Sequence, residues 1–249
     1  MNKGKLIVAN WKMNFLYKNA FNFCKNLLLK KKAINNSFII CPSSVLISQL
    51  ASKFKNIIFG AQDCHFEKFG AYTGDISPLM LKDINCKYVI IGHSERRTLL
   101  NESNSDVSKK LSLCSGSNIR PILCLGENQQ TRLNFEHIDF VRNQLRESVK
   151  NFNKWDSIIL AYEPLWAIGT GVPCEPNDAI EMINAIRSEL KIISGTDEIP
   201  ILYGGSVSSN NISNLIDSGD IDGALIGSSS MDPKEFSKII DICRSVWKV

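Results

Sequence analysis

Short and almost continuously apolar runs recur along the chain, and each run has the length of a β-strand. Such runs are typical of strands that are buried on both faces of a parallel sheet, because a strand with one exposed face alternates apolar and polar residues. The runs span residues 6–9, 38–41, 57–59, 88–91, 119–125, 158–161, 201–203 and 224–226. We therefore predict buried parallel strands at these places.

Apolar residues between several of these runs recur every three or four positions, which predicts helices with one buried face. The stripes are Leu16, Ala20, Phe23 and Leu27; Val141, Leu145, Val149 and Phe152; and Ala179, Ile183, Ile186, Leu190 and Ile193. Pro176 and Asp178 suit the first turn of the third helix, where proline and a carboxylate are favoured. Between residues 77 and 83 the pattern is weaker, and we expect a helix as short as a single turn.

Strand-then-helix units repeated through 249 residues favour an α/β chain that closes into an eight-stranded (β/α)8 barrel. A doubly wound open sheet is the alternative that the pattern leaves open. No linker, low-complexity tract or change in composition divides the chain. We expect residues 1–249 to form a single domain.

Composition places the chain among globular proteins, with 44% hydrophobic and 22% charged residues. The net charge of +4 is mild, and no basic stripe indicates a nucleic-acid partner. Neither a signal peptide nor a membrane-length apolar run is found, so we expect a cytoplasmic protein without a membrane partner. No two of the eight cysteines have C-x-x-C spacing, and free thiols in a reducing compartment are expected.

Residues with unusual chemistry follow the predicted strands at one end only. They are Asn10 and Lys12 after the first run, His93 after the fourth, Glu163 after the sixth, and the glycine-containing turns at 204–206 and 227–228 after the last two. In a barrel of this type the carboxyl ends of the strands carry the catalytic residues, whereas the opposite end contributes to stability. The distribution predicts an active site at the carboxyl ends.

Glu163, His93 and Lys12 form a set that can move a proton next to a carbonyl group. A carboxylate can remove the proton, an imidazole can polarise the carbonyl, and an ammonium can stabilise the negative charge and help to bind a dianion. His93 precedes a predicted helix start, which favours a neutral imidazole. We expect His65 and His137 to be structural. No cluster has metal-ligand spacing, so we expect no metal.

The stretch 161–171 predicts a lid over this site. It combines a rigid Pro164, an apolar middle around Trp166, and glycines at 169 and 171 that allow close approach of the backbone. For Glu163 taken alone, an acidic cap on a buried connection is the alternative. Backbone amides in the turns after the last two strands can converge on an anion, and barrels often bind phosphate there. We therefore expect the lid to cover a phosphate group.

Four motifs resemble the signature sequences of the triosephosphate isomerase family. They are NWKMN at 10–14, GHSERR at 92–97, AYEPLWAIGTG at 161–171 and YGGS at 203–206. The resemblance runs in the right order from the first strand to Gly227. It implies a TIM barrel that interconverts dihydroxyacetone phosphate and D-glyceraldehyde 3-phosphate through an enediolate, without a cofactor, in glycolysis and gluconeogenesis.

The resemblance also implies a role for individual residues. Glu163 would be the base and His93 the electrophile. Lys12 and Asn10 would contact the substrate's oxygens, with Glu95 as a support beside Lys12 and Cys124 packed near the base. The phosphate would be bound by amides at Gly169, Ser206, Gly227 and Ser228.

The segment 62–77 contains three aromatic residues, Phe66, Phe69 and Tyr72, which are too many for a solvated loop. In the family this segment inserts into a partner subunit, and the residue that matches Thr73 lies near the other active site. The resemblance thus implies a homodimer that binds triose phosphates.

Two places depart from common usage in the family. Ser228 stands where a second glycine is usual, and a positive φ there would cost a non-glycine residue about 1 kcal/mol. The far hinge of the lid reads Val172-Pro173-Cys174. Proline restricts φ and removes one hydrogen-bond donor. We hypothesise that Pro173 biases the hinge geometry without preventing closure.

Two other functions are compatible with a barrel: an enzyme acting on another sugar phosphate, and a non-catalytic interaction protein that retains the fold. The residues from Trp166 to Gly171 and the single glutamate argue against the first. The presence of Lys12, His93 and Glu163 together argues against the second, because a binding scaffold needs none of them.

Overall fold

A computed structural model describes residues 5–30, 38–168 and 174–248 of the chain. The predicted phosphate contact at Gly169 and the hinge residues Val172 and Pro173 lie outside the described residues.

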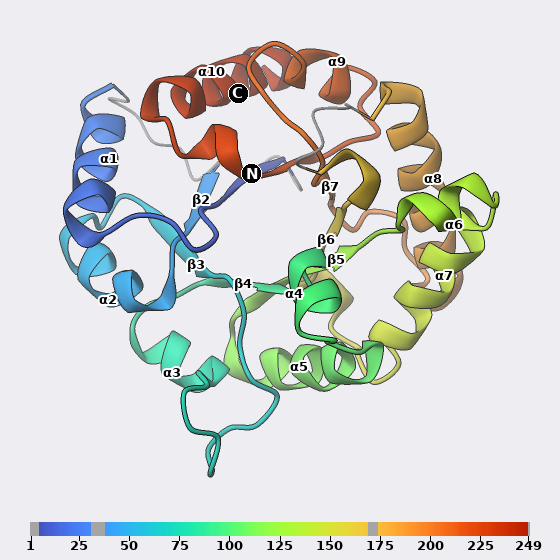
Figure 1. The fold of residues 1–249 in the computed structure, drawn as a ribbon, viewed down its shortest axis with the longest axis horizontal. Coiled ribbons are helices and arrows are strands. Elements are labelled where there is room, and N and C mark those ends of the chain that lie inside the picture. Colours follow the sequence, from blue (N-terminus) through green and yellow to red (C-terminus); the bar gives the residue numbers. More distant parts are fainter. Residues whose placement is uncertain (1–4, 31–37, 169–173, 249) are drawn as a thin grey trace.

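Within the described residues, eight parallel strands pair in chain order and close into a barrel (Figure 1). The strands are β1 (Leu6–Asn10), β2 (Phe38–Cys41), β3 (Ile58–Ala61), β4 (Tyr88–Ile91), β5 (Arg120–Leu125), β6 (Ile159–Tyr162), β7 (Ile201–Tyr203) and β8 (Gly223–Ile226). The last strand pairs with the first, with Val8 opposite Leu225. The predicted (β/α)8 barrel is confirmed, and the open sheet is excluded because an open sheet would leave these two strands as edges.

Helices surround the barrel and cover its outer face (Figure 1). They are α1 (Tyr17–Lys30), α2 (Ser44–Lys53), α3 (Pro78–Asp83), α4 (Ser94–Leu99), α5 (Asn104–Ser117), α6 (Gln129–Leu133), α7 (His137–Ser148), α8 (Pro176–Ser194), α9 (Ile212–Ile216) and α10 (Pro233–Trp247). Short 3-10 turns lie at η1 (Trp155–Ser157), η2 (Leu165–Ala167) and η3 (Ser228–Ser230). Among the described helices, none combines the length and the apolar character needed to cross a bilayer.

The predicted helical stripes are confirmed in their middles and differ at their ends. Leu16 precedes α1, and its side chain is 80% exposed. Its carbonyl instead accepts the amides of Asn19 and Ala20, which starts the helix one residue later. Val149 and Phe152 are buried but lie beyond the end of α7. A periodic pattern thus identified the buried faces better than the helix ends, because a buried turn continues the same apolar spacing.

Two predicted helix starts are found in the structure. Pro176 and Asp178 occupy the first turn of α8. The weak helix is α3, with six residues, and the side chain of Ser77 accepts the amide of Met80 to cap its start. A side-chain cap of this kind satisfies an amide that has no partner within the helix.

Alternation along the strands divides the core into two parts. One part fills the barrel and consists of Leu6, Val8, Ile39, Cys41, Ile90, Ile122, Cys124, Ile159, Ala161, Leu202 and Leu225. The other lies between the barrel and the helices and includes Ile7, Ala9, Leu123, Leu160 and Tyr162. Side chains two positions apart point to the same side of a strand. Asn10 and Glu163 follow inward residues at that spacing, and both line the pocket at the barrel mouth.

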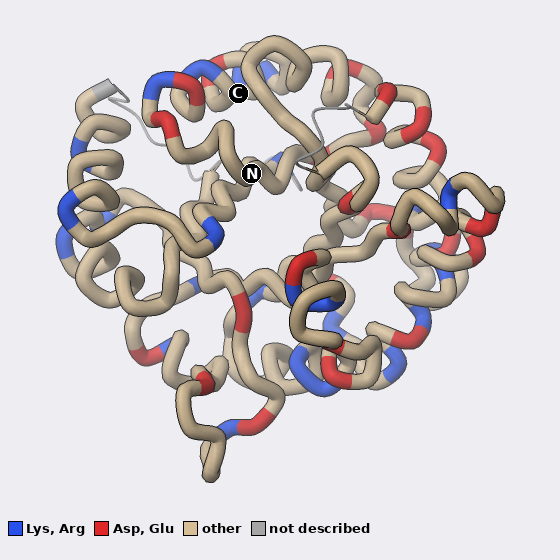
Figure 2. Tube along the Cα trace, in the orientation of Figure 1, with Lys and Arg blue, Asp and Glu red and all other residues tan. Residues whose placement is uncertain are grey.

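Acidic and basic residues are interspersed around the outer helices, and neither sign forms a continuous stripe along the ring that Figure 2 shows. The charge that a small ligand meets therefore comes mainly from the few side chains at the barrel mouth.

Candidate active site

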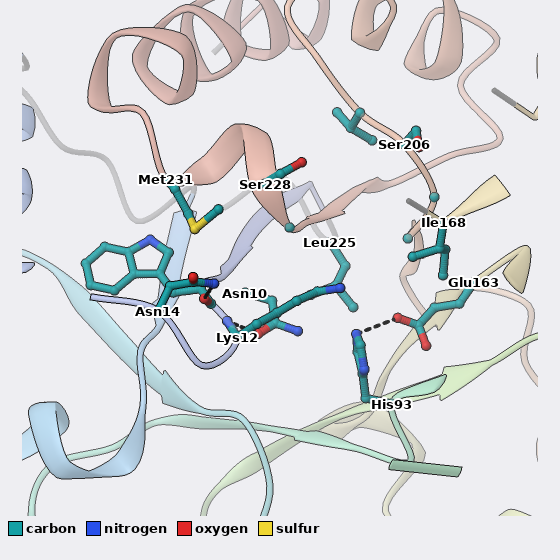
Figure 3. Close-up of a pocket in the computed structure, with 15 residues that line it drawn as sticks. Asn10, Lys12, Asn14, His93, Glu163, Ile168, Ser206, Leu225, Ser228 and Met231 are labelled. Carbon is teal, nitrogen blue, oxygen red and sulfur yellow. Dashed lines mark hydrogen bonds and ion pairs between the residues drawn. The ribbon is translucent and has the colours of Figure 1, made fainter. Parts of the chain in front are cut away.

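A pocket opens at the carboxyl ends of the strands, and most of the predicted site residues line it (Figure 3). The lining consists of Asn10, Trp11, Lys12, Asn14, His93, Glu163, Ile168, Gly204, Gly205, Ser206, Val207, Leu225, Gly227, Ser228 and Met231. The sequence had given no site role to Asn14, Val207, Leu225 or Met231. The position of Leu225 could have been predicted, because it stands two residues before Gly227, on the strand that leads to it, and so points to the same side. No sequence feature indicates Met231.

Glu163 and His93 point toward one another across this pocket (Figure 3). Nε2 of His93 lies 3.1 Å from Oε1 of Glu163. Nδ1 of His93 accepts the amide of Glu95 at 3.2 Å, so the ring proton of the neutral imidazole is on Nε2 and donates to the carboxylate. The other carboxylate oxygen of Glu163 accepts the amide of Ser94 at 2.8 Å. With 2% of its side chain exposed, Glu163 is held by directed donors rather than by bulk water.

His93 owes its position to the turn between β4 and α4, of which it is the N-cap. Gly92, at φ +69, makes this turn, and Nε of Arg97 donates to its carbonyl at 2.7 Å. A second nitrogen of Arg97 donates to the carbonyl of Cys124 at 3.3 Å, which ties the turn to β5. Burial lowers the pKa of the Arg97 guanidinium, although the group stays charged. One partly buried arginine therefore ties the main chain just before His93 to β5.

Lys12 extends across the pocket from a strained turn between β1 and α1. Its φ is +52 and that of Phe15 is +68. Each such residue costs of order 1–3 kcal/mol and persists only where its surroundings hold it. The ammonium of Lys12 lies 2.5 Å from Oε1 of Glu95. A Cβ at Gly227 would lie 3.4 Å from Cε of Lys12, so the cation passes beside the turn that follows β8.

The turns after β7 and β8 are joined to each other. Oγ of Ser229 donates to the carbonyl of Val207 at 2.6 Å, and Oγ of Ser230 donates to the carbonyl of Gly227 at 2.6 Å. Ser228 starts η3 and is not among the residues with positive φ, so the strain expected of a non-glycine residue there does not arise. The two turns form one rigid wall of the pocket.

Three glycines leave room for Glu163 and for Tyr203. A Cβ at Gly126 would lie 1.7 Å from the carbonyl oxygen of Glu163, and one at Gly204 would lie 2.9 Å from Cγ of Glu163. At Gly205 it would lie 2.2 Å from the hydroxyl oxygen of Tyr203. The sequence predicts an anion-binding role for the amides of the turn after β7. The structure adds that the missing side chains of its glycines leave the space that Glu163 and Tyr203 occupy.

Glu127, directly after Gly126, anchors the start of the predicted lid. Its Oε1 accepts the hydroxyl of Tyr162 at 3.0 Å, the indole N–H of Trp166 at 2.9 Å and a nitrogen of Arg132 at 3.4 Å. Burial, followed by the charge of Glu127, raises the pKa of Tyr162. On the other side, Oγ of Ser206 donates to the carbonyl of Ala167 at 2.7 Å. The described part of the lid is thus tied to β5 and β7. The sequence analysis assigned no role to Glu127, although it follows the predicted strand at 119–125 by two residues.

The two cysteines near the site are buried. Burial, followed by the charge of Glu163, raises the pKa of Cys124, so this residue packs as a neutral thiol. Burial raises the pKa of Cys174 to about 12, and its side chain is 4% exposed. A reactive thiol at the hinge would need exposure and a low pKa. Cys174 has neither.

Several predicted residues lie away from the pocket. Thr73 is exposed on segment 62–77 and does not line the pocket. His65 stacks on Phe66 with ring centroids 4.3 Å apart, and Nε2 of His137 lies 3.8 Å from a carboxylate oxygen of Glu181. Among the described residues, no group of three or more His, Cys, Asp or Glu is placed to hold a metal ion.

Comparison with known proteins gives consistent matches. The family model described as triosephosphate isomerase matches residues 5–243. The triosephosphate isomerase of Caldanaerobacter subterraneus subsp. tengcongensis is 40% identical over 243 residues, which is 95% of this chain and 98% of that protein. Those of Aquifex aeolicus and Dictyoglomus thermophilum are 38% and 40% identical over 242 and 244 residues, again 95% of this chain and 98% of each relative. The matches include every strand that contributes to the pocket.

Proposed function

Because the chain belongs to the triosephosphate isomerase family, we propose that Glu163, His93 and Lys12 carry its reaction. The enzyme is an isomerase that interconverts dihydroxyacetone phosphate and D-glyceraldehyde 3-phosphate, a step of glycolysis. The observation that carries the proposal is the 3.1 Å contact between Nε2 of His93 and Oε1 of Glu163 at the pocket.

Glu163 is the general base. Its carboxylate takes the proton from the carbon next to the substrate's carbonyl, which leaves an enediolate, and returns a proton to the neighbouring carbon. The position of Glu163 supports this role, because its side chain lines the pocket within reach of a bound substrate. In the structure the amide of Ser94 and the imidazole of His93 hold the carboxylate at the pocket wall.

His93 is the electrophile. Its Nε2–H is directed into the pocket, where it can donate to a substrate oxygen in place of Glu163 and move a proton between the two neighbouring oxygens. The amide of Glu95 occupies Nδ1, which supports a neutral imidazole that acts as donor through Nε2. A neutral donor can stabilise the enediolate without fully transferring its proton in the first step.

Lys12 and Asn10 meet the substrate's oxygens, and Glu95 holds the ammonium from the other side. We assign the phosphate to the amides of Ser206, Gly227 and Ser228, together with Gly169 of the lid. The short η3 turn after β8 supports this assignment, because barrels of this type bind phosphate at the loops after strands seven and eight and at a short helix beside them. The passage of Lys12 beside Gly227 adds a positive charge there.

A coupled assay for triose phosphate interconversion tests the base. We expect Glu163→Gln to lower kcat/KM by about 10²–10⁴-fold, which is the usual contribution of a positioned general base. Glu198→Gln, an exposed residue outside the pocket, is the matched control and should behave like the parent. An unchanged rate in Glu163→Gln would refute the assignment of the base.

We further propose a homodimer built on segment 62–77, which extends beyond the ring of helices (Figure 1). Phe69 and Tyr72 on this segment are 70% and 43% exposed, and Met13 beside the pocket is 94% exposed. Several exposed apolar side chains gathered on one projecting segment favour a protein contact there, whereas single exposed ones are common. A partner that covers them would bring Thr73 close to the other active site.

We also propose that residues 1–249 form one domain and that the protein is cytoplasmic. All eight cysteines are free and buried, which is expected of a protein from a reducing compartment. The family match from residue 5 to residue 243 supports a single domain.

A further inference from the structure

From the hydrogen bonds at the ends of β1, β2 and β3, we infer that Gln62 is a positioning residue that holds the ammonium of Lys12 in place through the main chain. The inference rests on the proposed role of Lys12 in binding the substrate. Gln62 itself does not line the pocket, so it acts through Lys12 rather than on the substrate.

Gln62 is the first residue after β3, and its carboxamide bridges two carbonyl groups. Nε2 donates to the carbonyl of Lys12 at 2.7 Å and to the carbonyl of Cys41, at the end of β2, at 2.9 Å. A carboxamide nitrogen carries two N–H donors, and carbonyl oxygens only accept. The two contacts therefore fix the orientation of the side chain and use both donors. The end of β3 is tied in this way to the turn after β1.

The main chain that Gln62 holds is the strained one. Lys12 has a φ of +52, and its own amide donates to Oδ1 of Asn10 at 3.0 Å. On the other side of the residue, the carbonyl accepts from Gln62 and from Oγ of Ser43 at 3.3 Å. Both peptide groups that flank the Lys12 side chain are thus held by side chains. A left-handed residue needs such contacts, because the extended and right-handed regions are otherwise favoured.

Ser43 provides a second sign that this carbonyl is specifically held. Ser43 is the N-cap of α2, a position where a serine side chain usually accepts an amide of its own helix. Its side chain makes no such cap bond in the structure and donates to Lys12 instead. Two side chains from two different strand ends therefore converge on one carbonyl oxygen.

The position of the ammonium depends on this turn. The φ and ψ of Lys12 set the direction in which its side chain leaves the backbone, and the side chain then passes Gly227 to reach Glu95. A rotation of the peptide at Lys12 would displace an ammonium at the far end of four methylene groups. Because Gln62 is also the first residue of segment 62–77, the same carboxamide connects the proposed dimer contact to the active site.

The test is a double-mutant cycle with kcat and KM measured for each variant. Gln62→Met removes both donors and keeps the length of the side chain. We expect it to lower kcat/KM by about 10–100-fold in the parent, as a displaced binding group does. In a Lys12→Ala background we expect Gln62→Met to change kcat/KM by less than about 2-fold, since its effect passes through the missing ammonium.

Gln130→Met is the matched control. Gln130 is exposed on α6, and its Nε2 donates to Oδ1 of Asn134 at 2.9 Å. The same substitution there should leave kcat and KM at their parent values. Ser43→Ala is a second probe that removes the weaker donor to the same carbonyl. It should lower kcat/KM in the parent and have no effect in the Lys12→Ala background.

Three results would overturn the inference. The first is an unchanged kcat/KM in Gln62→Met. The second is an equal loss in both backgrounds, which would mean that Gln62 acts on the fold rather than on Lys12. The third result applies if circular dichroism shows that Gln62→Met does not fold, so that Ser43→Ala becomes the test. It is a Ser43→Ala variant whose kcat/KM is unchanged in the parent, or falls equally in the parent and in the Lys12→Ala background. If Lys12→Ala alone is fully active, the proposed role of Lys12 fails, and this failure is visible without any change at Gln62.

Discussion

A Cβ on Gly204 would lie 2.9 Å from Cγ of Glu163, so the end of β7 limits where the side chain of Glu163 can go. The same Cβ would lie 3.1 Å from the carbonyl oxygen of Tyr162, which is main chain and cannot move aside cheaply. The position of Glu163, the proposed base, is therefore determined by two neighbouring strands, β6 through its backbone and β7 through an absent side chain.

Gly204→Ala is expected to displace Glu163 and lower kcat/KM by about 10²-fold, because a small displacement of a reacting group has an effect of that size. Gly116→Ala is the control: a Cβ at Gly116, within α5, meets no atom within 4 Å. That variant should keep full activity and be as stable as the parent or more stable, since alanine is favoured over glycine in helices. Full activity in Gly204→Ala would show that Glu163 has room to move aside.

Asp63 makes a pH-dependent contribution to stability. It lies in a partly buried cluster in which Nζ of Lys110 is 2.7 Å from Oδ1 and Nη2 of Arg96 is 2.9 Å from Oδ2. Burial raises the pKa of Asp63 above its usual value of 3.8, although Lys110 opposes this shift. The folded protein then binds the proton more tightly than the unfolded chain. Protonation of Asp63 therefore stabilises the folded protein. This stabilisation is fully present at a pH below the pKa of Asp63 in the unfolded chain, and it is lost as the pH rises through the pKa of Asp63 in the folded protein.

We therefore expect the parent to gain stability relative to Asp63→Asn as the pH falls from 7 toward 4. Urea unfolding of both proteins across this range measures the difference in the free energy of unfolding. A difference that stays constant, or one that shrinks as the pH falls, would contradict the raised pKa.

The thiols of the native protein should react slowly. All eight cysteines are buried, and burial raises the pKa of Cys24, Cys86 and Cys243, like that of Cys174, to about 12. At pH 8 only roughly one in 10⁴ of such groups is a thiolate, which is the reactive form. We expect less than about one equivalent of thiol to react with a disulfide reagent within minutes, and all eight after unfolding in urea. Rapid loss of several thiols in the native state would show that a buried site opens.

Glu127 should contribute strongly to stability, because its side chain is fully buried and accepts from Tyr162, Trp166 and Arg132. Glu127→Leu removes the acceptor of the buried Tyr162 hydroxyl, whereas Arg132 keeps its ion pair with Asp178 at 2.8 Å. We expect the free energy of unfolding to fall by about 1–3 kcal/mol, the usual cost of a buried polar group that loses its partner. Tyr162→Phe removes one hydrogen bond and should cost about 0.5–1.5 kcal/mol. Urea unfolding followed by tryptophan fluorescence measures both. Equal stabilities for Glu127→Leu and the parent would show that the buried carboxylate is dispensable.

The proposed dimer is built on segment 62–77, whose shape is held by internal contacts: the centroid of the His65 ring lies 4.3 Å from that of Phe66 and 4.2 Å from that of Tyr72. Phe69→Asp places a charge on this segment and should shift the protein to monomer at micromolar concentration, as measured by sedimentation. Phe135→Asp is the control, because Phe135 is 89% exposed but lies between α6 and α7, on another part of the ring (Figure 1). A parent that sediments only as a monomer would refute the proposed dimer.

Much of the fold could be predicted from the sequence because the signals are local. A strand buried on both faces is apolar at every position, whatever its neighbours are, and the predicted runs agree with the observed strands within two residues at either end. Helix ends were less accurate: Leu16 continues an apolar stripe although it lies in solvent, because periodicity reports spacing and not where the chain leaves a turn.

In the candidate site, too, some features could be predicted from the sequence and others could not. Glu163, His93 and Lys12 were identifiable because each lies within three residues of the end of a predicted strand, and a parallel barrel brings all such ends to one face. The contacts of Gly204 with Glu163, of Glu127 with Trp166 and of Gln62 with Lys12 join residues that are distant in the chain. Only the closure and register of the barrel decide which strand ends meet. The sequence by itself therefore determined which chemical groups stand at the mouth of the barrel, and the tertiary structure decided which neighbours hold them, because those distances depend on how all the strands pack at once.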